Sequence, residues 1–225
     1  MRVVVHNLRG FRRARPRRLA DAVRVFEPDV ILVTECGSKR KLRRFARALG
    51  MDAHHGSLPP LLRRARNAVL VRPPLVVERS GMHVFRDSQR FHPRGAYFAQ
   101  IVAPDHRLWA ISVHLGLKGE ERGRHSDELM RLLERTEPPL IVGGDLNAKP
   151  DSRVVERLAS IGWDAWSRMG QSTGETYPSD DPVARIDYLF VSRGIGVGAA
   201  MVPGGAAVRD ASDHLPLVVD LELPS

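Results

Sequence analysis

Polar side chains that could do chemistry recur where apolar, β-like segments of the sequence end. Asn7 follows the first such segment and Glu35 follows the second. Asp145 and Asn147 belong to a Gly-Asp-Leu-Asn sequence after a later apolar run. Because ligands of α/β folds bind where strands end at one edge of a sheet, we expect these carboxylates and amides to converge there. Together they could hold one divalent cation and one phosphate.

Two histidines and two further aspartates complete this set. His114 ends a strand-like run, Asp187 follows Arg-Ile, and Asp213 and His214 lie in a Ser-Asp-His-Leu-Pro sequence near the C-terminus. Hydrolysis of a phosphoester needs a cation that neutralises developing charge, a group that activates water and a donor facing the phosphoryl oxygens. Hard oxygen ligands favour Mg²⁺ or Mn²⁺, whereas the closely spaced Cys and His of a structural zinc site are lacking. Mg²⁺ is therefore the expected cofactor, with Mn²⁺ as the alternative.

Each of these residues also has an ordinary structural role as an alternative. An isolated Asn7 or Asn147 is more often a turn or cap residue, because Asn forms local backbone hydrogen bonds. Glu35 could be a charge at the N-terminus of a following helix, and His114 could be a core histidine. Their joint occurrence at strand ends favours function, since packing gives no reason to place all of them there.

The segments that must position these residues alternate in type at the start of the chain. Residues 3–6 and 30–34 have the composition of strands, while residues 19–26 and 42–49 carry apolar side chains at helical spacing. This pattern predicts a βαβα opening.

The rest of the chain mixes strand-like runs with fewer helices. Strand-like runs separated by Pro, Gly or charged turns predict antiparallel pairing at residues 67–71, 76–79, 96–102 and 108–114. Further strands are expected at residues 140–142, 186–191 and 217–223, and helices at residues 120–136 and 153–160. The Gly- and Ala-rich residues 194–205 are expected to form a tight or mobile connection. Mixed strands with helices outside them predict a layered α/β fold.

Composition and length predict one globular domain over residues 1–225. Hydrophobic residues make up 43% and charged residues 27%, which excludes a disordered chain. One cysteine excludes an intramolecular disulfide, and no run approaches the ~20 apolar residues of a membrane span. The three-valine run after Met1-Arg2 is too short for a signal peptide. We therefore expect a cytoplasmic protein without stable membrane insertion.

The net charge of +9 is unevenly distributed. Residues 1–72 contain 18 basic and 5 acidic residues, whereas residues 141–225 contain 7 and 12. A basic face raises the local concentration of phosphate-bearing partners, so it favours binding to nucleic acid or anionic lipid. Most of the cations are Arg, however, which a GC-rich coding sequence also produces, so a merely solvated basic face stays open as the alternative.

In their order along the chain, these motifs resemble the endonuclease/exonuclease/phosphatase superfamily of metal-dependent phosphoesterases. The resemblance covers nearly the whole chain, and any one motif alone would be weak. The matching segments are Val5-His6-Asn7, Val33-Thr34-Glu35, Ser112-Val113-His114-Leu115, Gly144-Asp145-Leu146-Asn147, Arg185-Ile186-Asp187-Tyr188 and Ser212-Asp213-His214-Leu215-Pro216. The resemblance implies a four-layer α/β/β/α sandwich of two mixed sheets, with the site at one edge of the sheets.

The resemblance also implies roles for the metal-side residues. Glu35 would be the principal metal ligand, and Asn7 would assist directly or through water. Asp213 would bind a second metal or a water of the first. Asp145 would activate or orient the attacking water, and Asn147 would hold the phosphate or that water.

The same resemblance implies roles for the histidines. His214 would contact the scissile phosphate, with Asp187 holding its imidazole in the required tautomer. His114 would face the phosphoryl oxygens or the leaving group from the other side. These three residues and the two acting on water form the expected catalytic set.

Three further residues lie in segments that are similar to segments of the family. Asn67 and Arg94 are expected either to contact phosphate or to buttress the cleft. Thr176 belongs to a Thr-aromatic-Pro segment that we expect to support Asp187.

The expected function is hydrolysis of a phosphoester by water, most readily as a nuclease or phosphodiesterase acting on nucleic acid. A lipid or inositol-phosphate phosphoesterase of the same superfamily is the alternative, and an inactive polyanion-binding protein is a third possibility. His114 stands where abasic-site endonucleases carry a Tyr-containing segment, which weakens a DNA-repair assignment. The expected partner is the phosphoester substrate, which nucleic acid could supply, and the expected state is a monomer.

Overall fold

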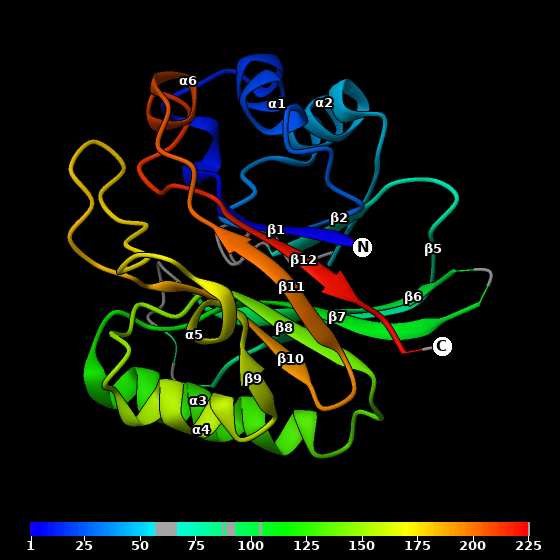
Figure 1. Cartoon of the computed structure of the whole chain (residues 1–225), viewed down its shortest axis with the longest axis vertical. Coiled ribbons are helices and arrows are strands. Elements are labelled where there is room, and N and C mark those ends of the chain that lie inside the picture. Colours follow the sequence, from blue (N-terminus) through cyan, green and yellow to red (C-terminus); the bar gives the residue numbers. More distant parts are fainter. Residues whose placement is uncertain (57–66, 87, 89–92, 104, 225) are drawn as a thin grey trace.

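Two six-stranded mixed sheets pack face to face, and helices cover their outer faces (Figure 1). The computed structural model describes residues 1–56, 67–86, 88, 93–103 and 105–224. The four-layer α/β/β/α sandwich expected from the sequence is confirmed.

The first sheet has the strand order β11-β12-β1-β2-β4-β3. Its strands are β11 (Gly196–Met201), β12 (Leu217–Glu222), β1 (Arg2–Asn7), β2 (Val30–Thr34), β4 (Ala68–Val71) and β3 (Asp52–His55). The β1–β2 pair is parallel, as the βαβα opening requires, and the other pairs are antiparallel. Its outer face carries η1 (Arg9–Phe11), α1 (Pro16–Arg24), α2 (Lys39–Leu49) and α6 (Ala206–Arg209), at the top of Figure 1.

The second sheet has the strand order β5-β6-β7-β8-β10-β9. Its strands are β5 (Val76–Val84), β6 (Gly95–Val102), β7 (Arg107–His114), β8 (Leu140–Asp145), β10 (Asp187–Ser192) and β9 (Gly162–Asp164). Only the β7–β8 pair is parallel among these described strands. The helices α3 (Gly119–Leu133) and α4 (Arg153–Ala159) cover its outer face, and α5 (Ala165–Met169) lies beside β9 and β10.

Apolar side chains fill all three spaces between the four layers. On β1, Val4 packs toward the helices, while Val3 and Val5 point into the space between the sheets. The same alternation separates Ile31 from Leu32 on β2. A strand that is buried on both faces needs apolar residues at every position, which explains the uninterrupted apolar runs of the sequence. Full burial of one such side chain contributes about 1.5–3 kcal/mol.

Helix α2 begins close to the end of β2, so its start fixes the backbone that follows Glu35. Ser38 caps the helix, and its Oγ accepts a hydrogen bond from the backbone N–H of Lys41. Gly50 ends the helix in the left-handed conformation. The buried face consists of Leu42, Phe45, Ala46 and Leu49, at helical spacing. The sequence therefore defines both ends of this helix.

The expectation of a connection at residues 194–205 is wrong for its central part, which forms β11. This strand pairs with β12 at the edge of the first sheet and contains a bulge between Val197 and Ala199. Its Gly and Ala residues lack the alternation that marks a half-buried strand, so only the pairing with a distant strand reveals it. Among the described helices, none is long and apolar enough to cross a membrane.

Candidate active site

The ends of strands from both sheets meet at one edge of the sandwich. Ser112 Oγ on β7 donates a 2.7 Å hydrogen bond to the carbonyl oxygen of Val33 on β2. Asn7 Nδ2 at the end of β1 donates a 3.0 Å hydrogen bond to Asp145 Oδ2 at the end of β8. All four side-chain or backbone groups are buried, so these bonds fasten the two sheets together at this edge.

Strand register in the second sheet places three of the expected catalytic residues side by side. Asp145 of β8 pairs with His114 of β7 on one flank and with Asp187 of β10 on the other. The preceding Gly144 has φ +150°, and a Cβ there would lie 1.8 Å from the carbonyl oxygen of Val113. Only glycine allows this close approach, so the Gly-Asp sequence is what brings Asp145 to His114.

The Asp145 carboxylate is the centre of the cluster. Its Oδ2 accepts from Asn7 and lies 3.2 Å from His114 Nε2 and 3.8 Å from His214 Nε2, while its Oδ1 accepts from the backbone N–H of Asn147 at 2.9 Å. Burial alone would raise the pKa of Asp145, but the charges and hydrogen bonds of the two histidines and the Asn147 N–H outweigh it and lower the pKa. Asp145 is thus held as a carboxylate.

His214 forms a carboxylate–imidazole pair with Asp187. The Nδ1 atom of His214 donates a 2.8 Å hydrogen bond to Asp187 Oδ2, and Thr176 Oγ1 donates to the same oxygen at 2.6 Å. The supporting role expected for Thr176 matches this geometry. Burial opposes charge on His214, but Asp187 and Asp145 outweigh it and raise the pKa of His214 to about 10. Burial raises the pKa of Asp187.

Residues around His214 fix its backbone and ring in ways that were not anticipated from the sequence. His6 Nε2 lies 3.1 Å from the carbonyl oxygen of His214, and burial lowers the pKa of His6 to about 4, so a neutral ring donates this bond. Ser212 Oγ donates to the carbonyl oxygen of Asn7 at 2.6 Å. The ring of Tyr177 lies 4.8 Å from that of His214. His6, Ser212 and Tyr177 are adjacent to or within the matched motifs, which is the signal that could have found them.

Glu35 lies on the other flank of the cluster and is reached through Arg94. The guanidinium of Arg94 contacts the imidazole of His114, with Nη1 2.7 Å from Nδ1, and lies 3.9 Å from Glu35 Oε1. Glu35 has φ +47°, a left-handed conformation that is strained for a residue with a side chain. Its side chain remains 38% exposed. An accessible carboxylate therefore lies beside Arg94, which contacts His114 of the cluster.

Asp213 and Arg9 lie beside the cluster. Arg9 Nε pairs with Asp213 Oδ2 at 3.1 Å, and the backbone N–H of Arg9 donates to Asn7 Oδ1 at 2.9 Å. Arg9 therefore links Asp213 to the residue that is hydrogen-bonded to Asp145.

The two remaining asparagines differ in their surroundings. Asn147 adopts φ +51°, which Asn tolerates, and its Nδ2 donates to the carbonyl oxygen of Leu115 at 3.0 Å. Asn67 is buried and donates from Nδ2 to the carbonyl oxygens of Gly95 and Ser112 at 2.8 and 2.9 Å. Both amide protons of Asn67 are thus used between the sheets, so the geometry favours the buttressing alternative over contact with phosphate.

The residues present fit a divalent cation. Carboxylate or imidazole atoms of Asp145, Asp187 and His214 lie within 4.8 Å of one another, and Asp187 Oδ1 is buried without a partner among the described residues. His214 Nδ1 and Asp187 Oδ2 are already bonded to each other, however, which makes them a poor ligand pair. The oxygen donors of Asn7, Glu35 and Asp213, the residues expected to bind the metal, suit a hard cation better.

Comparisons with known proteins identify the family and the fold. The family model described as the endonuclease/exonuclease/phosphatase family matches residues 4–214. A sequence search among curated proteins finds no significant match.

Solved structures show the same fold at low sequence identity. A Bacteroides vulgatus endonuclease/exonuclease/phosphatase is 20% identical with a TM-score of 0.84, over 99% of this chain and 98% of that one. The mannosyl-6-phosphatase Bt3783 of Bacteroides thetaiotaomicron is 20% identical with a TM-score of 0.82, over 99% and 100%. D. rerio TDP2 complexed with a single-strand DNA product is 17% identical with a TM-score of 0.74, over 99% and 98%.

The two facing sheets and the Asp–His cluster at their edge define the DNase I-like class of phosphoester hydrolases. Within that class, the chain belongs to the endonuclease/exonuclease/phosphatase family, as its match over residues 4–214 shows. The earlier resemblance is thereby confirmed for the family and the fold.

Proposed function

We propose that this protein is a metal-dependent phosphodiesterase that hydrolyses nucleic acid by attack of water on a phosphate held between His214 and a bound Mg²⁺ or Mn²⁺. The observation that carries the proposal is the buried network in which Asp145 contacts Asn7 and His114 while His214 is held by Asp187. A structural core gains little from gathering two carboxylates and two imidazoles at one sheet edge, because the cost of removing charges from water can exceed the gain from pairing them.

His214 is proposed to hold the phosphate. With its pKa raised to about 10, the imidazole is protonated at neutral pH, so Nδ1–H bonds Asp187 while Nε2–H is directed to the side of Asp145. A fixed cationic donor stabilises the charge that develops on the phosphoryl oxygens. His114, beside Arg94, supplies a second donor group on the opposite flank of Asp145.

Asp145 is proposed to orient the attacking water. Its lowered pKa makes it a weak base, since an effective general base has a pKa near the working pH. Its two oxygens are held by Asn7 and by the backbone of Asn147, so the carboxylate is fixed in direction. This geometry suits a carboxylate that positions the water first and accepts its proton only as the reaction proceeds.

Asn7 and Glu35 are proposed to hold the cation, with Asp213 contributing from the side of His214. The cation supplies neutralisation of the charge on the phosphate and on the leaving oxygen. Glu35 suits this role because its carboxylate is accessible.

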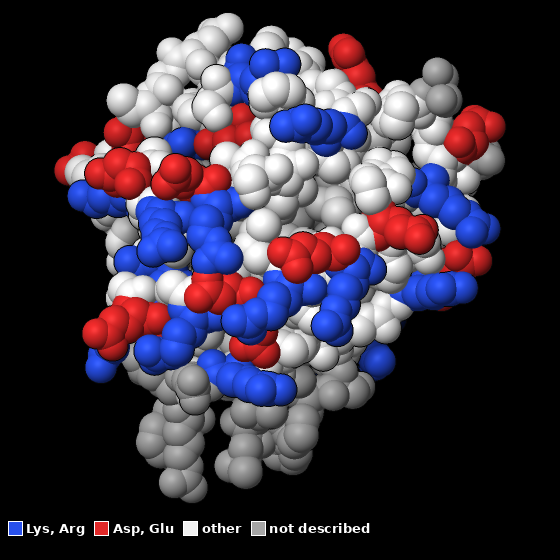
Figure 2. Space-filling view, turned by 90° about the horizontal axis from the view of Figure 1, so that it is seen from below, with Lys and Arg blue, Asp and Glu red and all other residues white. Residues whose placement is uncertain are grey.

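The charge of α2 favours nucleic acid as the substrate. This helix starts within a few residues of Glu35, contains no acidic residue, and exposes Arg40, Lys41, Arg43, Arg44 and Arg47. The four arginines have no carboxylate partner among the described residues. By contrast, Lys and Arg on the face covered by α3 and α4 are interspersed with Asp and Glu (Figure 2). A basic surface that begins a few residues after Glu35 attracts a polyanionic strand.

The test compares substrates side by side. Purified protein with Mg²⁺ or Mn²⁺ is incubated with plasmid DNA, single-stranded DNA, RNA, sphingomyelin and inositol phosphates. We expect cleavage of a nucleic acid, and loss of activity in EDTA. If only sphingomyelin or inositol phosphates are hydrolysed, nucleic acid is not the substrate and the lipid or inositol-phosphate alternative is correct. Turnover that persists in EDTA would contradict the metal mechanism.

Charge-removing variants separate substrate attraction from chemistry. Arg43→Gln combined with Arg47→Gln should weaken nucleic-acid binding and reduce the salt slope of log K by about 0.9 per lost phosphate contact. Arg131→Gln on α3 is the control, because it removes one exposed arginine from the mixed-charge face. Equal salt slopes in the wild type and the double variant would show that these two arginines of α2 do not contact the nucleic acid, and the charge of α2 would then no longer favour nucleic acid as the substrate.

A further inference from the structure

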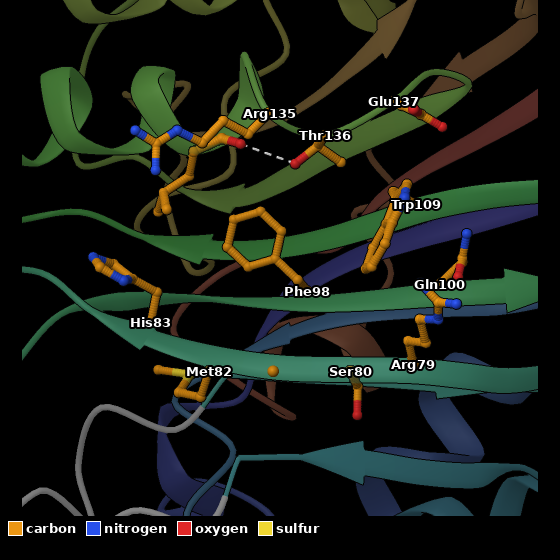
Figure 3. Close-up of a pocket in the computed structure, with 12 residues that line it drawn as sticks. Arg79, Ser80, Met82, His83, Phe98, Gln100, Trp109, Arg135, Thr136 and Glu137 are labelled. Carbon is orange, nitrogen blue, oxygen red and sulfur yellow. Dashed lines mark hydrogen bonds between the residues drawn. The ribbon is translucent and has the colours of Figure 1, made fainter.

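A hollow lies on the outer face of the second sheet, away from the catalytic cluster. It has a volume of about 650 Å³ and is bounded by β5, β6, β7 and the C-terminal end of α3 (Figure 3). Trp109 is five residues before His114 on β7, so the far end of the hollow is ~17 Å along the strand from the catalytic edge. His114 points between the sheets, whereas the hollow is on the opposite face. None of the proposed catalytic residues lines it.

Two aromatic rings form the floor of the hollow. Phe98 and Trp109 lie on neighbouring strands and both project to the outer face, with the Phe98 ring in the middle of the lining residues (Figure 3). Gly81 of β5 is paired with Phe98, and a Cβ added there would meet nothing within 4 Å. The strand therefore leaves space beside the Phe98 ring instead of covering it. A planar ring could enter this space and stack.

Two arginine side chains lie at the edges of the hollow. Arg79 on β5 and Arg135 after α3 are exposed and line the hollow, and neither has a carboxylate partner among the described residues. Gln100, between Arg79 and Trp109 in the strand register, has an Oε1 atom that is buried without a hydrogen-bond partner among those residues. An aromatic floor, two available guanidinium groups and an amide together match a flat ring that carries an anion.

We propose that this groove binds a nucleoside monophosphate, with the base against Phe98 and Trp109 and the phosphate at Arg79 or Arg135. Guanidinium groups bind phosphate through paired N–H donors, and aromatic side chains stack on any nucleobase. The volume lies within the range of about 300–1,000 Å³ that is typical of small-ligand sites.

A single nucleotide fits the groove better than a nucleic-acid strand does. Glu137 also lines the hollow, and Glu134 is exposed one residue before Arg135. These carboxylates would repel the additional phosphates of a strand, whereas one phosphate can be held by an arginine at the rim. The groove also faces away from the catalytic edge, so a strand engaged there does not extend into it.

The experiment measures binding of AMP to the full chain in EDTA by isothermal titration calorimetry. Adenosine, inorganic phosphate and a short oligodeoxyadenylate are measured in the same way. We expect AMP to bind at least about tenfold more tightly than adenosine or phosphate, because each of these lacks one half of the contacts. The oligonucleotide should bind no more tightly than AMP.

Variants locate the bound nucleotide. Arg135→Gln and Phe98→Leu should each weaken AMP binding about tenfold, and Gly81→Leu should abolish it by filling the open space. Arg131→Gln, on α3 but not among the residues that line the groove, should leave the Kd within about twofold. His214→Ala should also leave it within about twofold, because the groove does not include the catalytic cluster. Circular dichroism confirms that each variant is folded.

Several results would overturn the proposal. AMP that fails to bind, or that binds no better than adenosine or phosphate, would show that the rings and arginines do not act on one ligand. An unchanged Kd in both Gly81→Leu and Arg135→Gln would place the nucleotide elsewhere, and loss of binding in His214→Ala would place it at the catalytic cluster. Much tighter binding of the oligonucleotide would assign the groove to a strand. Each of these outcomes leaves the hydrolase proposal intact, since that rests on activity with metal.

Discussion

Replacement of Asp187 by Asn removes one negative charge from the catalytic cluster with almost no change in shape. In the native protein, Asp187 Oδ2 accepts hydrogen bonds from His214 Nδ1 at 2.8 Å and from Thr176 Oγ1 at 2.6 Å. An Asn oxygen can still accept both bonds, but its amide group would then occupy the place of the buried Oδ1, which has no partner among the described residues. The substitution therefore removes charge and introduces a buried, unsatisfied donor.

The charge change acts on His214. Asp187 and Asp145 raise the folded-state pKa of His214 from 6.5 to about 10 against the effect of burial. The stabilising imidazolium form is thus fully present below pH 6.5 and is lost as the pH rises through about 10. Loss of an opposite charge at hydrogen-bond distance typically changes a pKa by about 1–3 units, so Asp187→Asn should move this transition to lower pH by that amount. Misorientation of the ring should also lower the rate by about 10²-fold or more.

The assay is the pH dependence of kcat on the best nucleic-acid substrate from the side-by-side comparison. The alkaline limb of the profile should shift to lower pH in Asp187→Asn. Asp220→Asn is the matched control, because Asp220 pairs with Arg2 at the opposite end of β1 from Asn7. The control should retain the wild-type profile. A wild-type rate with an unshifted alkaline limb in Asp187→Asn would refute the assignment of His214 as the protonated phosphate-binding group.

Three other expectations concern the metal and the frame of the site. A chelator should abolish hydrolysis, and added Mg²⁺ or Mn²⁺ should restore it, as followed by product formation. Gly144→Ala should lower the free energy of unfolding in urea by at least about 2 kcal/mol, because the added Cβ would clash with the carbonyl oxygen of Val113. Gly123→Ala in α3, where a Cβ meets nothing within 4 Å, should raise this free energy slightly. Equal effects of the two substitutions would contradict the close approach of Gly144 to Val113. Asn67→Ala removes the side-chain donor to the carbonyl oxygens of Gly95 and Ser112. The free energy of unfolding in urea should therefore fall by about 1–3 kcal/mol. An unchanged urea midpoint would contradict the bracing role of Asn67.

The local pattern of the sequence was sufficient for the central elements of the fold. The strand at Val30–Thr34 and the helix ending at Leu49 follow from continuous and periodic apolar residues with clear capping signals. The edge elements were harder to predict. β11 is an example, because Gly and Ala carry no side-chain pattern and its pairing with β12 is set by residues far away in the chain.

The site likewise has a part that the sequence could predict and a part that it could not. Asp145, His214 and Asp187 could be named from the sequence because their types and order match a family, although their contacts could not. Contacts depend on register, and a shift of one residue would turn each side chain to the other face of the sheet. The supporting residue His6 escaped notice because its bond is to the backbone of His214, and any polar side chain in a strand could make such a bond.

The register of the second sheet also explains how the site can be rigid. His114, Asp145 and Asp187 are consecutive neighbours across β7, β8 and β10, so their spacing is fixed by backbone hydrogen bonds of the sheet. The hydrogen bond from Asn7 to Asp145 then fixes the position of the first sheet relative to these residues. Because catalysis by positioned charges requires donors that need not reorganise, two sheets locked at one edge are a suitable scaffold for it. Under the proposed function, substitutions on surfaces such as α2 can therefore change substrate preference while the proposed catalytic cluster stays the same.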